Sequence, residues 1–407
     1  MAVKQTLMGL NGDEAVAWAA KQCDVDFVSA YPITPQTIIV EKFSEFVANG
    51  EVKTRFVAVE SEHSALSACV GAAALGARTF TATAANGLAL MWEIVYIASS
   101  MRLPIVMVIA NRALSAPINI HCDHSDTMGC RDTGWIQIYC ENAQEAYDTV
   151  IQAYRIGEHE DVQLPVMVTL DGFLLSHTLQ NVQMLPDDVV KHFVGTRKPK
   201  EIEIPGLGKV PMILDPEKPL TFGPLDLYDY YFEHKVQQHE ALEKAIPIIR
   251  EINKEYAKIS GRSYGDGFIE TYGLEDAEIA TIVLGSTAGT VRYVVKRLRE
   301  EGIKAGMLRI RTFRPFPVKE IVNALKNVKV IGVMDRSGAF GGAGAPVYTE
   351  TKTAFYNEKE RPKIVNYIYG LGGRDTPPKL IRQVYSELEE ILKTGKIEKE
   401  IKFLGVR

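Results

Sequence analysis

The chain has 407 residues, of which 46% are hydrophobic and 24% charged, with a net charge of -5 and an isoelectric point near 6.0. This length accommodates two or three domains with large cores. The acidic balance argues against nucleic acid as the main partner. No apolar segment approaches the ~18 residues that span a membrane, and the first residues lack the long apolar region of a signal peptide. We therefore expect a cytoplasmic protein without a membrane segment.

The cysteines have no arrangement that is typical of disulfides or metal centres. There are five of them, Cys23, Cys69, Cys122, Cys130 and Cys140. An odd number without tight spacing fits reduced thiols in a cytoplasmic protein. Two histidines flank Cys122, but the gaps between the last three cysteines are wider than the compact spacings of zinc or iron–sulfur sites. We expect this chain to hold no metal of its own.

Residues 1 to about 180 alternate short apolar runs with helical patterns, which indicates a parallel sheet covered on both faces. One of the helices, within residues 64–76, consists almost entirely of small side chains and allows another backbone to approach closely. The predicted strands are Phe27–Ala30, Arg55–Val59, Thr79–Ala82, Ile105–Ala110, Trp135–Tyr139 and Val166–Leu170.

The turn after the first of these strands reads Tyr31-Pro32-Ile33-Thr34-Pro35. Two prolines fix φ twice and remove two backbone donors, so the turn is rigid. It holds the Thr34 hydroxyl at the carboxyl end of a strand, where open α/β sheets bind ligands. The simpler alternative is an ordinary strand-to-helix turn with Thr34 or Thr37 as the N-cap.

Two charged residues occupy equivalent places after other strands. Glu62 begins a helix directly after Arg55–Val59, where the helix dipole alone stabilises a carboxylate by roughly 0.3–1 kcal/mol. Arg112 lies at the carboxyl end of the strand Ile105–Ala110, where its guanidinium fork can bind a carboxylate or form a plain surface ion pair. If the strands are neighbours, Thr34, Glu62 and Arg112 converge on one crevice. The polar loop 121–132 that follows either lines the substrate path or is solvated.

The remainder of the chain predicts an arm, a helix and a second α/β unit. Seven prolines punctuate residues 186–224, which favours a linker or an arm that wraps a neighbour, and residues 228–259 then have a helical pattern. Strands and helices alternate again from 277 to 390. Gly285-Ser286-Thr287 opens a helix that can bind an anion, although it lacks nucleotide-binding spacing. We therefore divide the chain into residues 1–226, with the arm from about 181, a helical connector 227–276 and a second domain 277–407.

Several motifs stand in the order found in one enzyme family. Together they resemble the α subunit of the 2-oxoacid:ferredoxin oxidoreductases, most closely the pyruvate type. The motifs are Tyr31-Pro32-Ile33-Thr34-Pro35, Glu60-Ser61-Glu62-His63-Ser64, Thr83-Ala84-Ala85-Asn86-Gly87-Leu88, Asn111-Arg112-Ala113-Leu114-Ser115-Ala116-Pro117 and Asp171-Gly172-Phe173.

The resemblance implies a pyrimidine-type thiamine diphosphate-binding domain, a doubly wound parallel sheet, followed by a transketolase C-terminal-like α/β domain. It implies that Glu62 hydrogen-bonds the aminopyrimidine and that Thr34 and Arg112 hold the 2-oxoacid. It also places Tyr31, Ile33 and Asn86 beside the cofactor. The implied reaction is the reversible oxidative decarboxylation of pyruvate to acetyl-coenzyme A, with electrons passed to ferredoxin.

The other half of such a site has no counterpart in this chain. A complete thiamine diphosphate enzyme carries a GDG motif and an asparagine about 25–30 residues later. Gly265-Asp266-Gly267 lies in a polar connector rather than after an apolar strand, and the next asparagine is Asn323. The resemblance implies that a β subunit supplies the diphosphate site and Mg²⁺, that [4Fe-4S] clusters lie in partner subunits, and that γ and δ subunits complete the complex.

Three alternatives stay open on the sequence. A scaffold subunit would suit the proline-rich arm and the glycine loop at 338–344, but the joint presence of Glu62, Thr34 and Arg112 argues against it. A dehydrogenase with its own dinucleotide is disfavoured because no GxGxxG spacing is present. Within the family, a branched-chain or aromatic 2-oxoacid such as phenylglyoxylate is the alternative to pyruvate, since sequence does not give a pocket volume.

Overall fold

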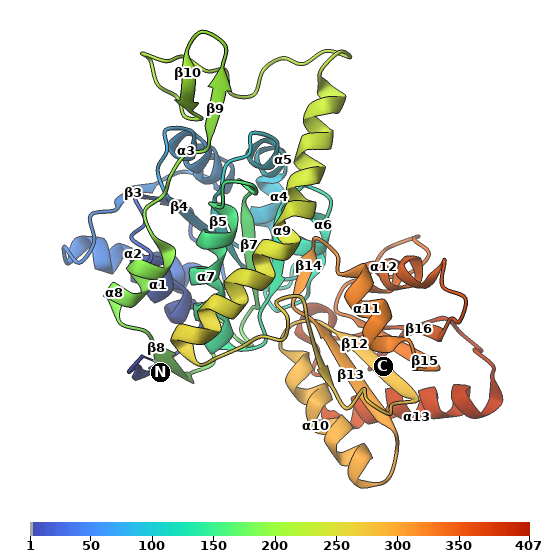
Figure 1. Ribbon diagram of the computed structural model, residues 1–407. Helices are drawn as coiled ribbons and strands as arrows, with labels where there is room; N and C mark the ends of the chain where they lie inside the picture. The colour runs from blue at the N-terminus through green and yellow to red at the C-terminus, as the bar shows by residue number, and fades with distance from the viewer. Residues whose placement is uncertain (1–2) are drawn as a thin grey trace.

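The computed structural model describes residues 3–407 and contains two α/β units joined by a long helix, α9 (Tyr231–Ser260) (Figure 1). The predicted α/β class is confirmed by two mainly parallel sheets. Within residues 3–407, no helix is both long and apolar enough to cross a membrane.

The N-terminal sheet has seven strands in the order β14-β6-β7-β5-β4-β2-β3. All pairs are parallel except β14 with β6. β14 comes from the C-terminal half of the chain, so the two halves share this sheet. The strands are β2 (Phe27–Ala30), β3 (Arg55–Ala58), β4 (Thr79–Thr83), β5 (Val106–Asn111), β6 (Ile136–Tyr139), β7 (Val166–Asp171) and β14 (Thr312–Arg314).

Both faces of this sheet are buried, as continuous apolar strands require. Side chains alternate along β5: Val106 and Val108 join the core under one set of helices, whereas Met107 and Ile109 join the core under the other. The first set is α1 (Gly12–Gln22), α2 (Thr37–Ala48), α7 (Ala143–Gly157), α8 (Asp187–Val194) and part of α9. The second set is α3 (Glu62–Ala74), α4 (Ala85–Leu90) and α5 (Trp92–Ser100).

The C-terminal sheet has six strands in the order β11-β13-β12-β15-β16-β17. Its strands are β11 (Ile269–Tyr272), β12 (Ile279–Val283), β13 (Ala305–Ile310), β15 (Val330–Asp335), β16 (Lys363–Ile368) and β17 (Ile401–Phe403). One face packs on α10 (Thr287–Glu300) and α13 (Pro378–Thr394), the other on α11 (Val318–Leu325) and α12 (Pro346–Phe355). The order changes direction between β12 and β15, so loops after these strands can meet a ligand or another domain.

Residues 181–226 form two different structures. β8 (Gln180–Met184) pairs with β1 (Thr6–Leu10), and α8 buries Val190 and Phe193 in the N-terminal core. Beyond Gly195 the chain leaves the body and forms the hairpin β9 (Glu201–Ile204) and β10 (Gly208–Pro211), which stands at the top of the molecule (Figure 1). Only this later part projects, because the amphipathic α8 has an apolar face that the core covers.

Candidate active site

The residues singled out after separate strands lie along one edge of the N-terminal sheet. In the order β3-β2-β4-β5, Glu62 follows β3, Thr34 follows β2, Asn86 follows β4 and Arg112 follows β5. Because these strands are parallel, their carboxyl ends share an edge. The strand order reverses between β2 and β4, which is the position where open α/β sheets form a ligand crevice.

Arg112 reaches across this edge to the turn that carries Thr34. Its Nη1 donates to the Thr34 carbonyl at 2.9 Å and its Nε donates to the Asn119 carbonyl at 3.0 Å. Nη2 donates to no residue in the described range 3–407, and Thr34 itself is exposed. A buried guanidinium therefore keeps one nitrogen without a protein partner in this range and is bonded to the turn that carries the exposed Thr34, an arrangement suited to a small carboxylate.

Glu62 is the first residue of α3, and its side chain is only 7% exposed. Ser61 is the N-cap of α3, and its hydroxyl accepts from the Ser64 amide at 3.2 Å. The Glu62 side chain is therefore not needed to cap the helix. Among residues 3–407 no donor hydrogen-bonds the Glu62 carboxylate, whose oxygens keep some contact with solvent although the residue is mostly buried. Buried charges are normally paired, so this carboxylate is available to a ligand.

Gly87 provides the space for that carboxylate. A Cβ atom at Gly87 would lie 2.7 Å from Glu62 Oε1 and 2.5 Å from the Thr83 hydroxyl. The preceding Asn86 is exposed, and its Oδ1 accepts from the Ser115 amide at 3.3 Å, in the loop that follows Arg112. The start of α4 therefore lies beside Glu62 and is hydrogen-bonded to the loop that follows Arg112.

Tyr31 and Ile33 lie in the same proline-bounded turn as Thr34. Tyr31 is 37% exposed and Ile33 is half-buried, so both contribute to the rim of the crevice. The buried Gln36 holds this turn against the sheet, since its Nε2 donates to the carbonyls of Tyr31 and Ala82 at 2.9 and 3.0 Å. The turn is thus positioned by the neighbouring strand β4.

Asp126 connects the loops that carry the crevice residues, a role that the sequence left open. Its Oδ2 accepts from the amides of Ala85 and Arg112, both at 3.0 Å, and its Oδ1 accepts from Asn111 Nδ2 at 2.8 Å. Ala85 has a φ of +43°, a left-handed conformation that this contact holds. Burial raises the pKa of Asp126 to about 6, although these hydrogen bonds favour the ionised form. Asp126 is therefore a positioning residue for the ends of β4 and β5.

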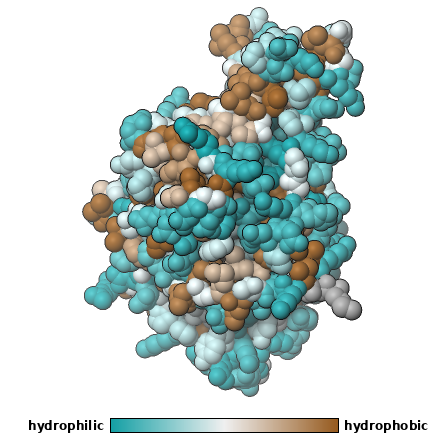
Figure 2. Space-filling view, turned by 90° about the vertical axis from the view of Figure 1, so that its left-hand side faces the viewer, coloured by the Kyte–Doolittle hydropathy of each residue, from teal (hydrophilic) through white to brown (hydrophobic). Residues whose placement is uncertain are grey.

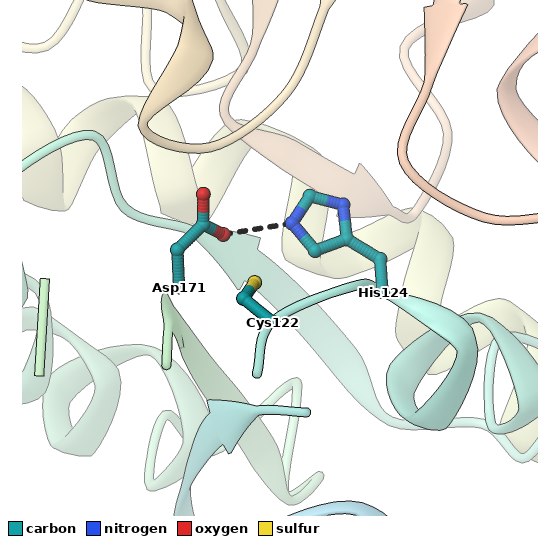
Figure 3. A group of neighbouring side chains, drawn as sticks. All are labelled: Cys122, His124 and Asp171. Carbon is teal, nitrogen blue, oxygen red and sulfur yellow. Dashed lines mark hydrogen bonds and ion pairs between the residues drawn. The ribbon is translucent and has the colours of Figure 1, made fainter. Parts of the chain in front are cut away.

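The loop 121–132 also brings Cys122 and His124 to Asp171, at the end of β7 (Figure 3). One potential ligand atom from each lies within 4.8 Å of the others. His124 Nε2 lies 2.8 Å from Asp171 Oδ1, which is direct hydrogen-bond contact, and Arg336 Nη1 donates to Oδ2 at 2.9 Å. Burial raises the pKa of the Cys122 thiol well above its ordinary value. A neutral thiol next to a fixed guanidinium is unfavourable for a cation, so the group is a buried ion-pair cluster.

Asp171 also occupies the anion site predicted at Gly285-Ser286-Thr287. The Ser286 amide donates to Asp171 Oδ2 at 3.2 Å, and the Ser286 hydroxyl donates to the same oxygen. The anion at the start of α10 is thus a carboxylate of the N-terminal unit. Burial would raise the pKa of Asp171, but the neighbouring His124 and Arg336 lower it below its ordinary value. This cluster, which we call the Asp171 latch (Asp171, His124, Ser286 and Arg336), joins the two units.

Gly265-Asp266-Gly267 forms a turn between α9 and β11. Asp266 Oδ1 accepts from the amides of Phe268 and Ile269 at 2.9 and 3.0 Å. The carboxylate therefore closes the turn, and the segment does not follow a parallel strand. This geometry gives a structural role to a sequence that superficially resembles a diphosphate motif.

Comparison with known proteins identifies the family of this chain. Residues 18–254 match the family described as pyruvate flavodoxin/ferredoxin oxidoreductase, thiamine diphosphate-binding, and residues 277–381 match pyruvate:ferredoxin oxidoreductase core domain II. The chain is 54% identical over 400 residues to the pyruvate synthase subunit PorA of Thermotoga maritima, covering 98% of both chains. It is 43% identical to the ketoisovalerate oxidoreductase subunit VorA of Pyrococcus horikoshii, again covering 98% of both.

Solved structures share the fold. The 2-oxoglutarate:ferredoxin oxidoreductase from Magnetococcus marinus superposes with a TM-score of 0.70 at 21% identity, over 95% of this chain and 65% of that one. A split-gene transketolase gives 0.53 at 12% identity, over 95% of this chain and all of that one. The resemblance read from the motifs is confirmed by these matches. The chain belongs to the pyruvate flavodoxin/ferredoxin oxidoreductase family, as a subunit of a 2-oxoacid:ferredoxin oxidoreductase.

Proposed function

We propose that this chain is the α subunit of a pyruvate:ferredoxin oxidoreductase and supplies the pyrimidine-binding half of a thiamine diphosphate site. The observation that carries the proposal is the unpartnered Glu62 carboxylate, buried at the switch point of a sheet whose edge also presents Thr34 and Arg112. The identity of 43–54% to pyruvate synthase subunits across nearly the whole chain supports the same conclusion.

Glu62 is the general acid and base for the cofactor. Its carboxylate would hold the pyrimidine ring by a hydrogen bond and take or return a proton there, while Gly87 keeps the space beside it open. Tyr31, Ile33 and Asn86 border the same crevice and would hold the ring there. Thiamine diphosphate, when bound, supplies the nucleophilic carbon and accommodates the charge left by the loss of carbon dioxide. The residues of this chain orient the reactants and hold the proton.

Arg112 and Thr34 bind the 2-oxoacid. The free Nη2 of the Arg112 guanidinium pairs with the substrate carboxylate, and the Thr34 hydroxyl donates to the same group. Asp126 fixes the Arg112 backbone and so keeps the side chain aimed at the substrate. A small hydroxyl residue at position 34 favours a substrate with one carboxylate.

Arg112→Lys should raise KM for pyruvate about 10- to 100-fold, because a point charge replaces a fork that makes a charge-assisted hydrogen bond of ~1.5–3 kcal/mol. The value of kcat should change less, since this contact exists before the reaction. Steady-state kinetics of the assembled enzyme measure both. Arg131→Lys is the control, because Arg131 forms a half-exposed pair with Asp132 and hydrogen-bonds none of Thr34, Glu62 and Arg112. An unchanged KM in Arg112→Lys would exclude the carboxylate contact.

The chain depends on partners for the rest of the site. A β subunit holds the diphosphate and Mg²⁺, [4Fe-4S] clusters in partner subunits accept the electrons, and γ and δ subunits and ferredoxin complete the path. Coenzyme A is the cosubstrate, and the complex is cytoplasmic. Within the chain, residues 1–226 form the pyrimidine-binding-type domain, 227–276 the connector and 277–407 the transketolase C-terminal-like domain.

The substrate is tested with the complete complex, isolated without oxygen, by coenzyme A-dependent reduction of a viologen dye. Pyruvate should give the highest kcat/KM of a panel that includes 2-ketoisovalerate and phenylglyoxylate. Preference for a branched-chain acid would instead assign the ketoisovalerate activity named for the relatives that are 41–43% identical. Reduction that does not need coenzyme A would exclude the proposed reaction class.

A further inference from the structure

The segment that leads into α9 exposes an unusual number of large apolar side chains. We call residues 225–236 the aromatic arm. The exposed fractions are 97% for Tyr228, 73% for Phe232, 63% for Tyr230 and 57% for Tyr231, and Leu225 and Leu227 are exposed beside them. The arm continues the projection that bears the β9–β10 hairpin, which stands clear of the body with hydrophobic residues on its surface (Figure 2).

The exposed aromatic area of the arm reaches the upper end of what a typical monomer leaves in water and approaches one side of a standard interface. At ~150–250 Å² for each aromatic side chain, the exposed parts of the four rings amount to roughly 600 Å². The largest apolar patch on a typical monomer is about 300–600 Å² in total. A standard interface covers about 800 Å² on each partner, and tyrosine and tryptophan are enriched among its strongest contacts.

The arm is continuous with the candidate active site. Tyr231 of the arm and Tyr96 of α5 line one open pocket of about 560 Å³. Tyr96 packs edge-on against Trp92 with ring centroids 5.4 Å apart, and Trp92 is 43% exposed. At the other end of this face, Glu93 pairs with His63 at 3.5 Å, and His63 adjoins Glu62. Exposed aromatic side chains on α5 thus connect the arm to the polar His63–Glu93 pair beside the crevice.

We propose that the aromatic arm clasps the same partner chain that completes the thiamine diphosphate site. This inference rests on the proposed function, because it takes the crevice as half of a composite site. A second copy of this chain fits less well, since Gly265-Asp266-Gly267 is a closed turn and offers no diphosphate half. Asp229 and Glu233 are exposed within the arm, so the partner's matching surface is an apolar groove with a basic rim.

Tyr228→Asp and Phe232→Asp, made separately, test the proposal by the dissociation constant between the full-length chain and the remaining subunits. Each should weaken binding by at least about tenfold, because a buried aromatic contact is replaced by a desolvated charge. Both side chains are mostly exposed in this chain, so its own fold should be unaffected. Tyr356→Asp is the matched control, an aromatic residue that is 69% exposed at the end of α12, and it should bind normally.

Measuring turnover as well as binding distinguishes a failure of this proposal from a failure of the proposed function. With excess of an arm variant, the assembled enzyme should reach the wild-type kcat, because the arm touches neither cofactor nor substrate. Unchanged binding in both arm variants would overturn the proposal. Loss of self-association with unchanged binding to the other subunits would also overturn it and assign the arm to a second copy. A wild-type complex that assembles but does not oxidise pyruvate would contradict the proposed function and leave the arm result standing.

Discussion

Glu62→Gln should lower kcat for pyruvate oxidation by about 10²- to 10⁴-fold, the usual contribution of a positioned acid or base. Glutamine keeps the shape of the side chain and its hydrogen-bonding reach but cannot exchange a proton with the ring. Glu62 is 7% exposed and its carboxylate has no partner among residues 3–407, so the substitution breaks no internal hydrogen bond and should leave assembly intact. Single-turnover kinetics of the assembled enzyme, with cofactor binding measured separately, would isolate the effect on the chemistry.

Glu60→Gln provides a matched control two residues away. Glu60 is exposed and accepts a hydrogen bond from the Ser64 hydroxyl at the start of the same helix, so its loss should leave kcat within about twofold. Gly87→Ala tests the role of Glu62 by a second, independent route. Its Cβ would lie 2.7 Å from Oε1, and it should therefore lower kcat without replacing any ionisable group. Full activity in both Glu62→Gln and Gly87→Ala would rule out the proton-transfer role.

Asp171→Asn should destabilise the fold by about 3–5 kcal/mol, the usual cost of breaking a buried ion pair by removing one partner. The side chains of Asp171, His124 and Arg336 are 2–4% exposed, and the asparagine would leave the guanidinium without its charged partner. The Asp171 latch also joins β7 of the first unit to the loops after β12 and β15 of the second. Chemical denaturation should therefore reveal both lower stability and separate unfolding of the two units.

The same carboxylate predicts how stability depends on pH. The pKa of Asp171 is lower in the folded chain than in the unfolded one, so its contribution is present above about pH 4, the unfolded pKa, and is lost as the pH falls below that value. The difference between wild type and Asp171→Asn should shrink in that range. Glu301→Gln is the control, because the pair of Glu301 with Arg382 is about half exposed and solvent screening should leave it little effect on stability. A pH-independent difference would contradict the assigned role.

The central strands could be predicted to within one or two residues because they are short, continuous apolar runs. β5 and β7 are buried on both faces, and that burial appears directly as Val, Ile and Met in the sequence. The placement of Thr34, Glu62 and Arg112 at strand ends followed from the same pattern. Their actual proximity required the strand order, which periodicity does not contain.

Other features depend on contacts between distant parts of the chain. In the sequence Asp126 is only one charge in a polar loop. Its four acceptor contacts arise because α6 (Ser125–Gly129) folds back over the ends of β4 and β5. Asp171 fills the start of α10, although the sequence of that start suggested an external anion. β14 joins the N-terminal sheet across an interval of about 170 residues, and no local pattern of three residues announces such a pairing.

The most direct test of the composite site is reconstitution from separate subunits. This chain alone, the remaining subunits alone, and the mixture are each supplied with thiamine diphosphate, Mg²⁺, coenzyme A and pyruvate, and viologen reduction is measured without oxygen. We expect turnover only in the mixture, and its loss when the added chain carries Glu62→Gln. Turnover by the remaining subunits without this chain, or equal turnover with Glu62→Gln, would show that the chain is a scaffold and contradict the account.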